Sequence, residues 1–173
     1  MKGTKKEIHI NDKVIHYTHI EKGSSRVCFM FSGSGYNYDK PLFYEVLKDE
    51  QYNETMFLGK SLGTIPIANN LMKREDFLQS KMIVLTPLLT FDSIFDSILH
   101  SSHEGLLVIG DKDHQYNANQ IDQLYKTNLT IDVVKNANHS LNVGEYETES
   151  SIEAIAKIMR KLKETIETSR AEL

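Results

Sequence analysis

The sequence has few of the features that mark several large classes of protein. It contains one cysteine, Cys28, among 173 residues, which excludes both a disulfide framework and a cluster of thiolate metal ligands. No stretch approaches the roughly 18 consecutive apolar residues that a membrane-spanning helix requires. The polar N-terminus, M-K-G-T-K-K-E, lacks the apolar core of a signal peptide. We therefore expect a cytoplasmic protein with no membrane partner.

A strong excess of charge is also missing. The formal net charge is -4, from 20 lysine and arginine residues against 24 aspartate and glutamate residues, so nothing favours nucleic acid as a partner. The chain has no H-E-x-x-H zinc motif. Its S-G-S-G stretch at 32–35 lacks the lysine of a Walker loop and the spacing of a dinucleotide-binding fingerprint. We expect neither a metal nor a cofactor.

Short apolar runs alternate with amphipathic segments along the chain. Short, mainly apolar runs predict buried strands at 27–31, 56–58, 81–85 and 106–109, and the segment 129–134 is predicted to be the last strand. Helical spacing predicts helices at 41–52, from Leu62 to Met72, at 91–99, at 119–126 and from Ser150 onward. Two alternating segments around Asn11-Asp12 predict an N-terminal β-hairpin. The order predicts one α/β domain over 1–173, with a mostly parallel sheet covered by helices on both faces.

The last two predicted helices have specific expected faces. In the helix at 119–126, Ile121, Leu124 and Tyr125 are expected to point inward. Ser150 and Glu153 have the spacing of a capping box at the start of the final helix. The expected buried face of this helix consists of Ile152, Ile155, Ala156, Met159 and Leu162.

A G-x-S-x-G motif, Gly59 to Gly63, lies between a predicted strand and a predicted helix. This order is typical of a nucleophile elbow, where a sharp, strained turn points the serine hydroxyl out of the sheet. The two glycines fit because side chains there would collide with the neighbouring strand and helix. The alternative is an ordinary turn in which Ser61 is the N-cap of the helix. Lys60 is expected to be solvated.

Two further polar residues follow later strands in an informative order. A serine hydroxyl needs a base to accept its proton, and the base needs an acid to orient it. The order Ser61, Asp113, His139 is the one found in α/β-hydrolases. The motifs V-C-F-M-F-S-G-S-G, L-G-K-S-L-G, L-L-V-I-G-D-K-D and N-A-N-H-S resemble those of this family. The resemblance covers most of the chain from Arg26 onward.

The resemblance implies roles for three side chains. Ser61 would be the nucleophile and His139 the general base. The family's acid lies three residues after the glycine that ends its strand, which gives Asp113. Asp111 and Asp92 remain alternatives for the acid.

The resemblance also implies an oxyanion hole made of two backbone N–H groups. One donor would come from Leu62, after the nucleophile, and the other from Ser34, in the loop after the strand at 27–31. The commoner family pattern has His-Gly where this chain has Ser32-Gly33. A backbone donor can survive that change, although the loop must be braced differently.

The chain departs from the family between Gly35 and Gly59. Only 23 residues, 36–58, lie where the family has two helices and a strand, so one strand and one helix are missing. Either the hairpin pairs directly with the strand at 27–31, or the sequence is an internally shortened form of a longer protein. An exposed strand edge there would favour a homodimer.

These residues predict a cofactor-independent serine hydrolase that acts on a small ester or thioester through an acyl-enzyme. The space between Pro87 and Gly105 fits one helix and no cap domain, which favours a small or open-ended substrate. A peptidase of the same fold has the same signature. The missing strand and Ser32 support a different alternative, a catalytically inactive hydrolase-like binding or regulatory protein.

Overall fold

A five-stranded parallel sheet forms the centre of the computed structural model, which describes residues 3–10, 13–20, 27–31, 33, 55–145 and 147–168. The strand order follows the sequence: β3 (Val27–Phe31), β4 (Thr55–Lys60), β5 (Lys81–Leu85), β6 (Gly105–Gly110) and β7 (Leu129–Val134). Because all five strands are parallel, their carboxyl ends lie at one edge of the sheet, where ligands bind in such folds.

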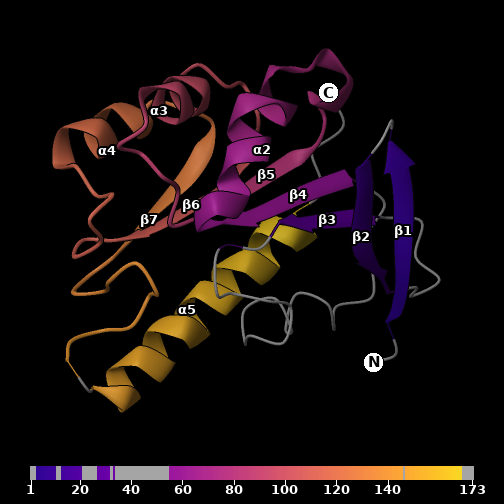
Figure 1. The fold of residues 1–173 in the computed structure, drawn as a ribbon. Helices are drawn as coiled ribbons and strands as arrows, with labels where there is room; N and C mark the ends of the chain where they lie inside the picture. The colour runs from indigo at the N-terminus through magenta and orange to yellow at the C-terminus, as the bar shows by residue number, and fades with distance from the viewer. Residues whose placement is uncertain are drawn as a thin grey trace.

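Helices cover both faces of this sheet (Figure 1). On one face lie α2 (Thr64–Asn69), α3 (Asp92–Leu99) and α4 (Ala118–Leu124), and α5 (Thr148–Glu167) crosses the other face. Short 3-10 turns, η1 (Ser61–Gly63), η2 (Leu71–Lys73) and η3 (Glu75–Phe77), flank α2. The predicted α/β class, with helices on both faces and an N-terminal hairpin, is confirmed. The predicted helix at 41–52 lies outside the described residues.

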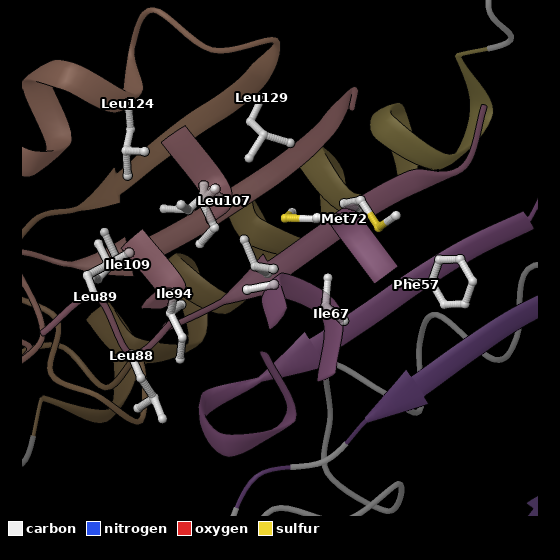
Figure 2. Close-up of a cluster of buried hydrophobic side chains, with 14 of the residues drawn as sticks. Phe57, Ile67, Met72, Leu88, Leu89, Ile94, Leu107, Ile109, Leu124 and Leu129 are labelled. Carbon is white, nitrogen blue, oxygen red and sulfur yellow. The ribbon is translucent and has the colours of Figure 1, made fainter. Parts of the chain in front are cut away.

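The strands are apolar throughout because both of their faces are buried. In β5, Met82 and Val84 point to the cluster beneath α2, α3 and α4, part of which Figure 2 shows. Ile83 and Leu85, between them, point to the cluster beneath α5. Full burial of each such side chain stabilises the fold by about 1.5–3 kcal/mol relative to exposure.

The N-terminal hairpin is a separate sheet. Strands β1 (Thr4–Ile10) and β2 (Lys13–His19) pair antiparallel with one another, and β3 is the end strand of the main sheet. The direct pairing of hairpin and β3 that we considered is not found among the described residues. Among the described residues, β4 is the strand that pairs with β3.

Three expectations about the helices were wrong in detail. Helix α4 ends at Leu124, and Tyr125 beyond it is exposed rather than inward. Helix α5 begins at Thr148, so Ser150 lies inside the helix and does not cap it. Ile152 is 63% exposed instead of buried.

Of the helices in the described part of the chain, none combines the length and apolar character needed to span a bilayer.

Candidate active site

Ser61 lies on a strained turn immediately after β4. Its φ is +53°, in the left-handed region that costs a residue with a side chain about 1–2 kcal/mol. The turn is close-packed, because a Cβ atom at Gly59 would lie 2.4 Å from the Gly63 carbonyl oxygen, and one at Gly63 would lie 1.9 Å from the Phe31 carbonyl oxygen. The two glycines of the motif therefore allow a turn that no other residue pair fits.

The hydroxyl of Ser61 meets the ring of His139. The distance between Ser61 Oγ and His139 Nε2 is 2.8 Å. The other ring nitrogen, Nδ1, lies 2.9 and 2.8 Å from the two carboxylate oxygens of Asp113. With a carboxylate at Nδ1, a neutral ring carries its proton there, so Nε2 accepts from the Ser61 hydroxyl. The alternative role of Ser61 as a helix N-cap is wrong, because no side chain caps η1 or α2.

Of the three candidate acids, the structure brings Asp113 to His139. The Asp113 carboxylate is fully buried, whereas the His139 side chain is 27% exposed. The Asp113 N–H donates to the Gly110 carbonyl at 3.1 Å, which fixes the turn after β6. Asp111 instead accepts a hydrogen bond from the Asn136 backbone at 2.6 Å. Asp92 lies in the first turn of α3.

His139 lies on a loop that follows β7. The Asn138 side-chain oxygen accepts hydrogen bonds from the Ser140 and Asn142 N–H groups, at 2.9 and 3.2 Å. The loop also contains two residues with positive φ, Asn136 at +58° and Leu141 at +67°. The loop thus has a specific irregular shape that its own polar contacts maintain.

Of the two residues expected to supply oxyanion donors, the structure describes Leu62 but not Ser34. Leu62 directly follows Ser61 at the start of the helical segment η1–α2, where the first N–H groups have no partner within the helix. Ser34 lies outside the described residues. Its neighbour Gly33 is described, and a Cβ atom there would lie 2.8 Å from Ser61 Cβ. The end of β3 therefore lies directly beside Ser61.

Lys60 is the functional candidate that the sequence did not reveal. Expected to be solvated, it is 3% exposed. Its ammonium donates to Thr86 Oγ1 at 3.0 Å and to the His139 carbonyl oxygen at 2.9 Å. Desolvation by burial lowers the pKa of Lys60 to about 8, while the charge of Asp113 acts in the opposite direction. Only the later loops bring these acceptors to Lys60, so no local sequence signal could have found them.

His114 adds a second imidazole at the rim of the site. Its ring centre lies 4.9 Å from that of His139, and its Nδ1 lies 3.3 Å from Asp113 Oδ1. Among the described residues, Asp113, His114 and His139 are the group whose ligand atoms are close enough to share a metal ion. Asp113 and His139 are already hydrogen-bonded to one another, so the arrangement matches an acid–base pair better than an open metal site.

Solved structures with the same fold include several esterases and hydrolases. The esterase Pf2001 of Pyrococcus furiosus matches with a TM-score of 0.65 at 13% identity, over 95% of this chain and 93% of that one. Dienelactone hydrolase of Anabaena variabilis gives a TM-score of 0.66 at 10% identity, over 95% and 98%. Est1E of Butyrivibrio proteoclasticus gives 0.62 at 10% identity, over 94% and 100%. The sequence matches no family model and no curated protein. At such low identity the likeness concerns the fold alone: the chain has the α/β-hydrolase fold.

Proposed function

We propose that the protein is a serine hydrolase that cleaves a small ester or thioester through an acyl-enzyme. The observation that carries the proposal is the chain of contacts from Ser61 Oγ through the His139 ring to the Asp113 carboxylate. A serine hydroxyl is a poor nucleophile by itself, and this chain supplies both the base and the acid that activate it. The esterases and hydrolases that share the fold support the same class of reaction.

In the first half-reaction, Ser61 Oγ attacks the substrate carbonyl carbon. The hydroxyl proton moves to His139 Nε2, and the buried Asp113 carboxylate stabilises the imidazolium that forms. His139 then gives that proton to the departing alcohol or thiol as the bond from the carbonyl carbon to the leaving group breaks. The product is an ester between the acyl group and Ser61.

In the second half-reaction, water takes the place of the serine. His139 removes a proton from the water, the resulting oxygen attacks the acyl carbon, and Ser61 recovers its proton from His139 as the acid leaves. In both halves the substrate oxygen becomes negative. We assign its stabilisation to the backbone N–H groups of Leu62 and Ser34, which act where the charge develops.

Two features favour a small or open-ended substrate. In the described chain, only α3 lies between β5 and β6, so no cap domain is inserted there. Leu62 and Phe91, which follow β4 and β5, expose apolar side chains at the sheet edge that carries Ser61. They offer a surface for a short acyl or alkyl group without enclosing a long chain.

Labelling with a fluorophosphonate probe tests the proposal, because the probe reacts with serines that a neighbouring base activates. We expect the wild-type protein to be labelled, and the Ser61→Ala and His139→Ala variants not to be. Ser140→Ala is a matched control, since Ser140 is an exposed serine beside His139. Short p-nitrophenyl esters and their thioester analogues then compare the two substrate classes.

The inactive alternative gives the opposite result. Wild-type protein that is folded by circular dichroism, but takes up no probe and turns over no ester, would overturn the hydrolase proposal. Such a result would favour a binding or regulatory protein on a hydrolase fold. Turnover that persists in Ser61→Ala would equally contradict the role of Ser61.

A further inference from the structure

A buried ammonium group joins three separate segments behind the Ser61–His139 pair. Lys60 is the last residue of β4 and pairs in register with Leu85, the last residue of β5. Thr86 follows Leu85 directly, and its hydroxyl accepts from Lys60 Nζ at 3.0 Å. The carbonyl of His139, 79 residues away along the chain, accepts from the same nitrogen at 2.9 Å. The ends of two strands and the histidine loop therefore share one donor.

Burial of a lysine side chain has a free-energy cost, which interactions of the buried ammonium must offset. A charged ammonium loses its hydration inside the protein, which the lowered pKa of Lys60 reflects. An apolar side chain at this place would fill the space without that cost. The hydrogen bonds from the Lys60 ammonium to Thr86 and to the His139 carbonyl offset part of that cost.

Thr86, at the same junction, has a strained backbone conformation. It is fully buried and has a φ of +45°, a conformation that is unusual for a β-branched residue. Its N–H donates to the Val108 carbonyl of β6, which holds the backbone in this conformation. Strained backbone persists where the surrounding structure enforces it, often at functional sites. Here the strained residue contributes the hydroxyl that accepts from Lys60.

We propose that Lys60 is a positioning residue, which holds the backbone of His139 against the ends of β4 and β5 so that the imidazole stays within reach of Ser61. The inference rests on the proposed function. Asp113 holds the ring at Nδ1, while Lys60 holds the main chain of the same residue. The ring is thereby fixed from two sides on a loop of irregular conformation. A displacement of about 1 Å between reacting groups can cost about a hundredfold in rate.

Lys60→Met tests the proposal, because methionine keeps most of the side-chain volume and loses the donors. We expect kcat on a short ester, and the rate of fluorophosphonate labelling, to fall about a hundredfold while KM changes by less than about threefold. Lys60→Arg, which keeps a charged donor, is expected to recover part of the rate. Lys112→Met is the matched control, because Lys112 is an exposed lysine in the turn before Asp113.

A spectroscopic readout separates the failure of this inference from the failure of the proposed function. The His139 Nδ1 proton, hydrogen-bonded to Asp113, gives a downfield proton resonance that His139→Ala identifies by its loss. We expect Lys60→Met to broaden or shift this resonance even if the wild-type protein hydrolyses no ester. If wild-type protein is inactive but the resonance responds, the hydrolase proposal fails and the positioning role stands.

The proposal is overturned if folded Lys60→Met keeps both its resonance and a wild-type kcat within about threefold. If Lys60→Met does not fold, Thr86→Val and Thr86→Ser replace it. Valine removes the acceptor of the Lys60 ammonium and serine keeps it. We then expect a lower kcat for Thr86→Val and a near-normal kcat for Thr86→Ser, and equal rates for the two would contradict the proposal.

Discussion

The backbone N–H of Gln115 donates to Oδ1 of Asp113 at 2.9 Å, within one turn of chain after β6. The same carboxylate meets His139 Nδ1 with both oxygens and is fully buried. A backbone donor cannot rotate away as a side-chain donor can. The main chain therefore orients the carboxylate independently of its contact with the imidazole.

Asp113→Asn should abolish most activity without unfolding the protein. An amide in this position can donate to Nδ1 and thereby favour the wrong tautomer of His139, so we expect kcat to fall about ten thousandfold. Asp111→Asn is the matched control, because Asp111 accepts from Asn136 and an amide oxygen can still accept that bond. Ester turnover by both variants checks this. Equal losses in the two variants would mean that Asp113 has no special role.

Ser61→Gly should be more stable than Ser61→Ala. Both variants lack the hydroxyl, but glycine adopts a φ of +53° without the steric cost that alanine has there. We expect the free energy of unfolding of Ser61→Gly to exceed that of Ser61→Ala by about 1 kcal/mol. Urea unfolding of the two proteins measures the difference. A more stable alanine variant would show that the turn at Ser61 is not strained.

Stability should depend on pH through Lys60 in a defined direction. The pKa of Lys60 is about 8 in the folded protein against 10.5 for a lysine in water, so between these values the unfolded chain binds more protons than the folded one. The free energy of unfolding of wild-type protein should therefore rise with pH in this window, by roughly 3 kcal/mol at most. Below pH 8, Lys60 is protonated in both the folded and the unfolded protein, so its contribution to stability no longer changes with pH.

Lys60→Met serves as the reference for this dependence, because groups that titrate in both proteins cancel in the difference. Urea unfolding at intervals from pH 7 to pH 10.5 gives the two curves. We expect the stability of wild-type protein to increase relative to the variant as pH rises. Parallel curves would mean that the Lys60 ammonium is not desolvated.

Two substitutions in α5 should differ strongly in their effect on the free energy of unfolding. Leu162 is buried against β4, β5 and β6, and Leu162→Ala should lower the free energy of unfolding by about 2–5 kcal/mol. Ile152 is 63% exposed, and Ile152→Ala should change it by less than about 0.5 kcal/mol. Urea unfolding measures both. Similar losses for the two would contradict the placement of the first turns of α5.

The strands and the order of the polar residues were accessible from the sequence because their signals are local. The expected strand at 81–85 agrees with β5 at both ends, since a lysine followed by four apolar residues, between Ser80 and Thr86, is too short for a helix and typical of a buried strand. In a parallel sheet the carboxyl ends of the strands meet at one edge, so the sequence alone predicts that Ser61, Asp113 and His139 lie near one another.

The parts that the sequence did not reveal depend on contacts between distant residues. Lys60 was expected in solvent because nothing near it in sequence indicates that Thr86 and the His139 carbonyl converge on its ammonium. Ile152 has the spacing of the buried face of α5, but it lies in the first turns of the helix, whereas the buried Ile158, Leu162 and Ile166 lie in later turns. Periodicity gives the face of a helix, and the extent of the sheet decides how much of that face is covered.

The order in which the sheet is made along the chain also determines when Ser61 can become reactive. Ser61 is synthesised 78 residues before His139, which follows the last strand of the sheet. Because domains generally acquire their long-range pairings only as the chain emerges, the serine of a nascent chain lacks its base until β7 has joined β6. An incomplete chain that ends before β7 carries the complete Gly59–Gly63 turn and no means to activate it.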